Sequence, residues 1–162
     1  MSATGHSWWQ RYGNIAQITS AVFALVGFGA ILVQLSEIRH HNRESGARQV
    51  YLAYTDLNFR NPQFALPNLA QLRADPALFE RYKTFVSYLL YACDEVINAF
   101  PGQKEWRKSC EYEVKEHLPF LCDTLASDPD FLETFGGRSL GFVKATMQHY
   151  GVAPPACQLK KA

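Results

Sequence analysis

Residues 15–43 read IAQITSAVFALVGFGAILVQLSEIRHHNR, and this stretch decides the fold class. Residues 21–33 contain no polar side chain, and the polar residues of the run lie toward its ends. About 20 apolar residues are what a helix needs to cross roughly 30 Å of hydrocarbon. The stretch therefore predicts a single membrane-spanning helix, to which we assign residues 14–36.

Two alternatives to a membrane span fit the sequence less well. A cleaved signal peptide has a basic start and a small-residue cleavage site. Here Arg11 is the only Lys or Arg before the run, and Leu35-Ser36-Glu37 is a poor cleavage site. A buried helix of a soluble protein is rarely apolar on every face over such a length.

The distribution of arginines predicts the orientation of the span. Arg11 stands alone before the run, whereas Arg39, Arg43 and Arg48 follow it. Because Lys and Arg accumulate on the cytoplasmic side, we expect residues 1–13 to form a short extracytoplasmic tail. The rest of the chain is then expected in the cytoplasm.

Aromatic and basic residues flank the run, as they do at the two interfaces of membrane helices. Two histidines beside the arginines add the alternative of a pH-sensitive contact with lipid headgroups. The residues expected at the interfaces are Trp8, Trp9, Tyr12, Arg39, His40, His41 and Arg43.

Small residues share one face of the predicted span. They are Ala16, Ser20, Ala24 and Gly27. Small side chains let helix backbones approach closely in lipid, where association depends on packing. This face predicts contact with another transmembrane helix, from a second copy or a different subunit. The alternative is that small residues are simply frequent in membrane helices.

In the remaining residues the apolar positions recur with helical periodicity, and no stretch of useful length alternates apolar and polar residues as a strand does. We expect a juxtamembrane helix over residues 37–61, ended by Asn61-Pro62, because the residue before proline avoids the helical region. A helical bundle follows over residues 62–150, and residues 151–162 form a flexible tail. The predicted fold class is therefore all-α, with the membrane helix continuing into a small cytoplasmic bundle.

Within the bundle, Asp75-Pro76 is a strong helix start, since aspartate caps and proline fits the first position. Pro119 is expected to kink a helix over residues 103–125. Asp128-Pro129 predicts a short helix, and residues 139–149 the last one. The expected seam of the longest helix is Tyr82, Val86, Leu89, Cys93, Val96 and Phe100.

Charge and cysteine content limit the chemistry. The net charge is +1 and no basic stripe is present, so nucleic acid is not expected as a partner. The four cysteines are Cys93, Cys110, Cys122 and Cys157, with no C-x-x-C pair. On apolar helix faces in a reducing compartment, they are expected to be free thiols without metal.

Three other constellations favour structural roles. Asp94 and Glu95 point to different helix faces, which argues against a paired acid–base role. Glu113 and His117 lie one turn apart, but two ligands do not make a metal site. Residues 136–139 read GGRS before a helix, which indicates an ordinary turn capped by Gly137 or Ser139. We predict no enzyme activity and no cofactor.

The stretches VQLSEIRHHNRESGARQ, YLAYTDLNFRNPQF and FERYKTFVSYLLYACDEVINAF, with Asp75-Pro76 between the last two, resemble uncharacterised bacterial single-pass membrane proteins with a helical domain. The resemblance covers most of residues 14–150 and implies a bacterial inner membrane. We expect a membrane-anchored interaction or scaffold protein that contacts lipid, either self-associating or an accessory subunit of a membrane complex. The alternative is a membrane-tethered sensor or effector whose bundle binds a small apolar ligand or lipid.

Overall fold

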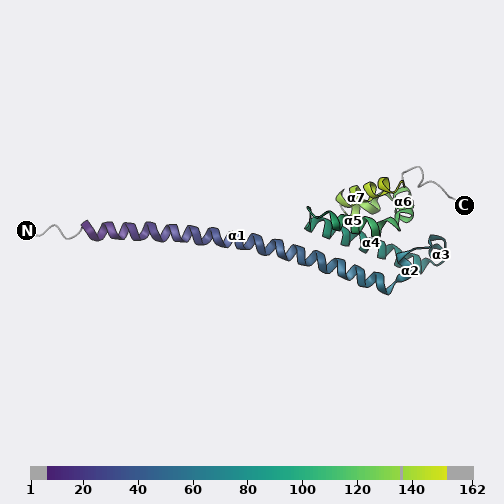
Figure 1. Cartoon of the computed structure of the whole chain (residues 1–162), viewed down its shortest axis with the longest axis horizontal. Coiled ribbons are helices and arrows are strands. Elements are labelled where there is room, and N and C mark those ends of the chain that lie inside the picture. The colour runs from purple at the N-terminus through teal and green to yellow at the C-terminus, as the bar shows by residue number, and fades with distance from the viewer. Residues whose placement is uncertain (1–6, 136, 153–162) are drawn as a thin grey trace, which may run out of the picture. The chain divides into compact units, whose positions relative to one another are not determined.

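A computed structural model describes residues 7–135 and 137–152, although the side chains of residues 7–16, 18, 129, 132, 133 and 137 lie outside that description. Every regular element in the described part is helical, which confirms the all-α prediction (Figure 1). The elements in chain order are α1 (Ser7–Arg60), α2 (Pro62–Ala65), α3 (Leu69–Ala74), α4 (Pro76–Ala99), α5 (Lys104–Lys115), α6 (Leu118–Ser127), the 3₁₀ helix η1 (Pro129–Phe135) and α7 (Gly137–His149).

Helix α1 contains the apolar run of the chain. By length and composition it could cross a membrane, and none of its most apolar stretch is buried. Phe23 and Leu25 each leave 73% of their surface exposed. Exposing such a side chain to water costs about 1.5–3 kcal/mol relative to burying it, so hydrocarbon is the favourable surrounding for this stretch.

The chain divides into two units, Met1–Arg43 and Glu44–Ala162. We call the second unit the helical domain. It takes in the last part of α1, where Ala47 and Tyr54 are buried against the domain core. Asn61 follows the last turn of α1, its backbone N–H and its side-chain amide both donating to the carbonyl of Leu57. Pro62 comes next and begins α2, so the helix ends where the sequence predicts.

Helix α4 is the centre of the helical domain. Asp75 caps it by accepting hydrogen bonds from the backbone N–H groups of Ala77 at 3.0 Å and Leu78 at 3.1 Å, and Pro76 occupies the first turn. The residues of the predicted seam are all buried. Helices α5 and α7 lie beside α4 and contact each other (Figure 1). The core therefore forms along α4.

The predicted helix over residues 103–125 is two helices rather than one kinked helix. Helix α5 ends at Lys115, and α6 begins at Leu118 with Pro119 in its first turn. Proline cannot donate to the preceding turn and its ring clashes with the carbonyl four residues earlier. The break places His117 at the N-cap of α6, inside the core.

Candidate functional site

The small-residue face of α1 is open along its described part. Ser20, Ala24 and Gly27 are exposed, and a Cβ added to Gly27 would meet nothing within 4 Å. Ala16 lies on the helical backbone of α1, but its side chain is outside the described residues. The described part of the chain therefore leaves this face available for another helix.

The predicted interface residues lie along the same helix. Arg39, His40, His41 and Arg43 are all exposed. His41 Nε2 lies 3.1 Å from Glu37 Oε1, one turn earlier. The two pair as ions only when the imidazole is protonated, and at this exposure such a pair adds little stability. Trp8, Trp9 and Tyr12 belong to α1, with side chains outside the described residues.

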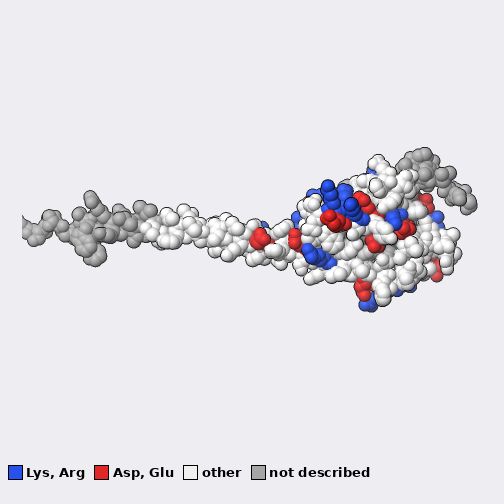
Figure 2. Space-filling model, in the orientation of Figure 1, with Lys and Arg blue, Asp and Glu red and all other residues white. Residues whose placement is uncertain are grey.

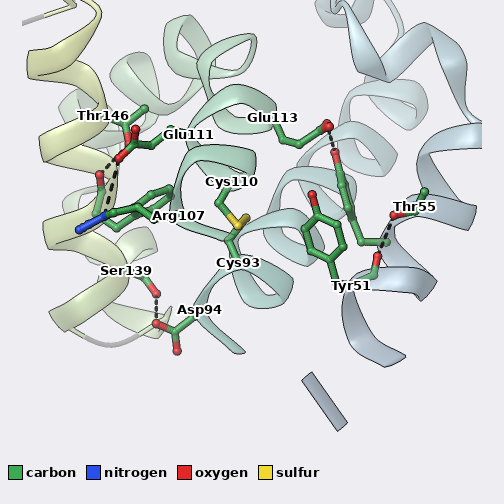
Figure 3. Close-up of a disulfide and its surroundings, with 12 residues drawn as sticks. Tyr51, Thr55, Cys93, Asp94, Arg107, Cys110, Glu111, Glu113, Ser139 and Thr146 are labelled. Atoms are coloured by element: carbon green, nitrogen blue, oxygen red, sulfur yellow. Dashed lines mark hydrogen bonds and ion pairs between the residues drawn. A yellow bond between two sulfur atoms is a disulfide. The ribbon is translucent and has the colours of Figure 1, made fainter. Parts of the chain in front are cut away.

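The cysteines differ from the prediction of free thiols. Cys93 of α4 and Cys110 of α5 form a disulfide with a Cα–Cα distance of 5.6 Å, and both are buried (Figure 3). Cys122 is also disulfide-bonded, and Cys157 lies outside the described residues. The sequence correctly places Cys93 and Cys110 on apolar stripes. The prediction was wrong because these stripes face each other and bring the two sulfur atoms together.

His117 is a buried histidine held by a tyrosine. Only 1% of its surface is exposed, and its Nδ1 lies 2.9 Å from the hydroxyl of Tyr82. Burial penalises the imidazolium and lowers the pKa of His117 to about 4. Burial also raises the pKa of the Tyr82 hydroxyl. Both groups are therefore neutral near pH 7, and their hydrogen bond lies within the core.

Glu113 and His117 do not share a ligand site. The hydroxyl of Tyr54 in α1 donates to Glu113 Oε2 at 2.9 Å, whereas His117 pairs with Tyr82. Burial and the neighbouring Glu113 carboxylate raise the pKa of Tyr54. Among the described residues, no group of three or more His, Cys, Asp or Glu side chains could hold a metal ion. The Tyr54–Glu113 bond instead joins α1 to α5.

Asp94 connects α4 to α7 through a polar network. Ser139 Oγ donates to one carboxylate oxygen at 2.9 Å (Figure 3), and Asn98 Nδ2 donates to the other at 2.9 Å. Arg138 Nη1 then donates to the side-chain Oδ1 of Asn98 at 2.6 Å. Both carboxylate oxygens of Asp94 are therefore engaged, and Glu95 takes no part in these hydrogen bonds. The network stabilises the packing of α7.

Ser139 also lies in the pattern Gly137-Arg138-Ser139-Leu140-Gly141, which has the G-x-S-x-G spacing of a hydrolase nucleophile. That motif needs an exposed serine on a sharp turn between a strand and a helix. Ser139 is instead 3% exposed in the first turn of α7, and its hydroxyl donates to a carboxylate. The burial and hydrogen bonding of Ser139 therefore indicate a structural role rather than that of a nucleophile.

Two grooves on the helical domain were not foreseen from the sequence. One of about 310 Å³ lies between α4, α5 and α7, with Leu90 and Phe142 in its lining. The other, of about 430 Å³, follows the corner between α4 and α5. Arg107 and Ile97 line both grooves. Their lining residues come from separate helices, so periodicity along one helix gives no signal for either.

The charged residues give the domain a mixed surface. On the face shown in Figure 2, Lys and Arg side chains are interspersed with Asp and Glu. Arg107 illustrates the mixing: its Nε lies 3.6 Å from Glu111 Oε1, and its guanidinium lies over the ring of Phe142.

Comparison of the chain with protein-family models, curated proteins and solved structures found no match.

Proposed function

We propose that the chain is a membrane-anchored interaction protein that associates through the small-residue face of α1. The observation that supports this is the open face of Ser20, Ala24 and Gly27 beside an apolar stretch with no partner in the described chain. Helices in hydrocarbon gain little from hydrophobicity and associate where backbones approach closely. The partner is a second copy of the chain or the helix of another subunit.

Replacing Ala24 and Gly27 with leucine tests this proposal. The double variant fills the small-residue face while raising the hydrophobicity of the span, so insertion is retained. The matched control is Val22→Leu/Val26→Leu, which adds volume on the opposite side of the helix, since each residue advances the helix by about 100°.

Chemical crosslinking in native membranes gives the readout. We expect Ala24→Leu/Gly27→Leu to lower the yield of the crosslinked adduct several-fold, and the control variant to leave that yield unchanged. The mass of the adduct separates a homodimer from a complex with another subunit. Equal adduct yields in wild type and Ala24→Leu/Gly27→Leu would overturn the role of this face.

We propose a bacterial inner membrane as the site of the protein, on the resemblance described above, with the helical domain in the cytoplasm. The excess of Arg39, Arg43 and Arg48 over Arg11 supports that orientation. Topology is set by such charges during insertion, before the domain has folded.

The disulfide between Cys93 and Cys110 favours the opposite side, because disulfides persist in oxidising compartments and are rare in the cytoplasm. In a cytoplasmic domain, the bond would form only under oxidising conditions. A reporter fused after Ala162 decides between the two. Fluorescence of a cytoplasmic reporter supports the proposal, and activity of an alkaline phosphatase fusion would place the domain outside.

A second candidate is a sensor that binds a small apolar ligand or lipid. The groove of about 310 Å³ favours it, because Leu90, Ile97 and Phe142 give it an apolar lining. Its volume lies at the lower end of the range for small-molecule sites. Native mass spectrometry of the protein extracted from membranes separates the candidates: a bound lipid or metabolite favours the sensor, and a stoichiometric protein partner favours the interaction protein.

A further inference from the structure

The corner between α4 and α5 packs against the part of α1 where the helical domain begins. The guanidinium of Arg48 lies 5.1 Å from the ring centroid of Phe100. Trp106 stacks on Phe100 at 5.5 Å and meets Tyr51 edge-on at 5.2 Å. These aromatic contacts fix residues 100–106 beside residues 48–51. The corner is therefore at the end of the domain where the chain enters from the apolar run.

The length of chain between the two units limits how far this end can lie from the membrane. Leu35 is the last residue of the apolar run, and Glu44 is the first of the helical domain. The intervening residues span about 14 Å as a helix and at most about 32 Å fully extended. This short connection keeps the corner within reach of lipid headgroups on whichever side of the membrane the domain lies.

The groove at this corner combines an apolar lining with cations. It has a volume of about 430 Å³ and is lined by Phe100 and Pro101 together with Lys104, Arg107 and Lys108. Lys104 and Lys108 are exposed and have no ion-pair partner among the described residues. Glu111 also lines the groove and pairs with Arg107, and Glu105 is exposed in the first turn of α5. The corner thus carries an excess of positive charge.

We propose that the α4–α5 corner docks on anionic phospholipid headgroups of the membrane that α1 enters, with Lys104 and Lys108 contacting the phosphates. Each Lys or Arg near an anionic membrane surface strengthens attachment roughly fivefold. Phe100 and Pro101 form part of the apolar lining of the same groove. Docking holds the helical domain against the membrane. This contact rests on the membrane anchoring proposed above, but it does not depend on the helix association.

The test uses the full chain in lipid nanodiscs. One set contains phosphatidylcholine alone, and in the other about one third of the lipid is phosphatidylglycerol. Hydrogen exchange of residues 100–111, followed by mass spectrometry, reports the docking. We expect exchange to slow several-fold in the anionic nanodiscs. Raising NaCl from about 0.1 M to about 1 M shortens the Debye length from about 10 Å to about 3 Å and is expected to remove the protection.

Two charge-reversal variants complete the test. Lys104→Glu/Lys108→Glu is expected to abolish the lipid-dependent protection. The matched control, Arg60→Glu/Arg81→Glu, makes the same change in charge away from the corner: Arg60 lies in the last turn of α1, and Arg81 of α4 donates to Asn61, the next residue. It is expected to retain the protection. Equal exchange in the two lipids for the wild type, or equal loss of protection in both variants, would overturn the proposal.

Discussion

Acidification is expected to destabilise the helical domain through His117. The pKa of this imidazole is lowered from 6.5 to about 4 by burial in the folded state. The unfolded chain therefore binds a proton at His117 more readily than the folded chain does, and the free energy of unfolding falls as the pH falls. The contribution is fully present above about pH 6.5, declines between about pH 6.5 and 4, and is lost below that range.

The magnitude follows from the two pKa values. Each pKa unit corresponds to 1.36 kcal/mol, so His117 alone removes about 3 kcal/mol from the free energy of unfolding at pH 4 and about 2 kcal/mol at pH 5. Domains of this size are stabilised by only about 5–15 kcal/mol. The titration of this one residue is therefore a large fraction of the total.

Urea unfolding of the full chain in detergent, followed by near-ultraviolet circular dichroism, measures the effect at pH 7 and pH 5. Surface carboxylates and other histidines also titrate in this range, so the comparison is with His117→Gln, which lacks the buried imidazole. The wild type is expected to lose about 2 kcal/mol more than the variant between the two pH values. Equal losses would refute the conclusion that burial holds His117 neutral.

The packing of the domain gives three more expectations. Leu89→Ala in the buried seam is expected to lower the free energy of unfolding by about 2–5 kcal/mol, and Leu52→Ala, at an exposed position, by less than about 0.5 kcal/mol; urea unfolding that gave equal costs would contradict the assigned core. Under oxidising conditions, mass spectrometry of the alkylated, unreduced chain is expected to find Cys93 linked to Cys110. Replacing both cysteines with alanine is expected to cost about 3 kcal/mol under those conditions, and no cost would show that the bond does not stabilise the domain. Tyr54→Phe, which leaves Glu113 without its donor, is expected to cost about 1 kcal/mol, and an unchanged unfolding midpoint would remove the Tyr54–Glu113 bond from the account.

Several helix boundaries of this fold were predictable because local chemistry marks them. Asp75-Pro76 marks the start of α4, and Asn61-Pro62 marks the end of α1. The seam of α4 was predictable because heptad-like spacing of apolar residues identifies a buried face without knowledge of its partner. These features depend on residues within about one or two turns of one another.

Features that depend on pairs of helices were not predictable in the same way. Cys93 and Cys110 were assigned to apolar faces, but only the crossing of α4 and α5 shows that the sulfur atoms meet. The partners of His117 and Glu113 lie on α4 and α1, which the sequence does not reveal. The α4–α5 groove was not predictable either, because its cations and apolar lining come from two helices and the residues that connect them.

Alkaline carbonate extraction of membranes tests the central claim, that the apolar part of α1 is embedded in lipid. The wild-type chain is expected to remain in the membrane pellet. Leu25→Arg/Phe28→Arg places two charges in the apolar run, at a cost of about 2.5–3.5 kcal/mol each near the centre of a span, and is expected to move the chain to the supernatant. Release of the wild-type chain by carbonate would contradict the account.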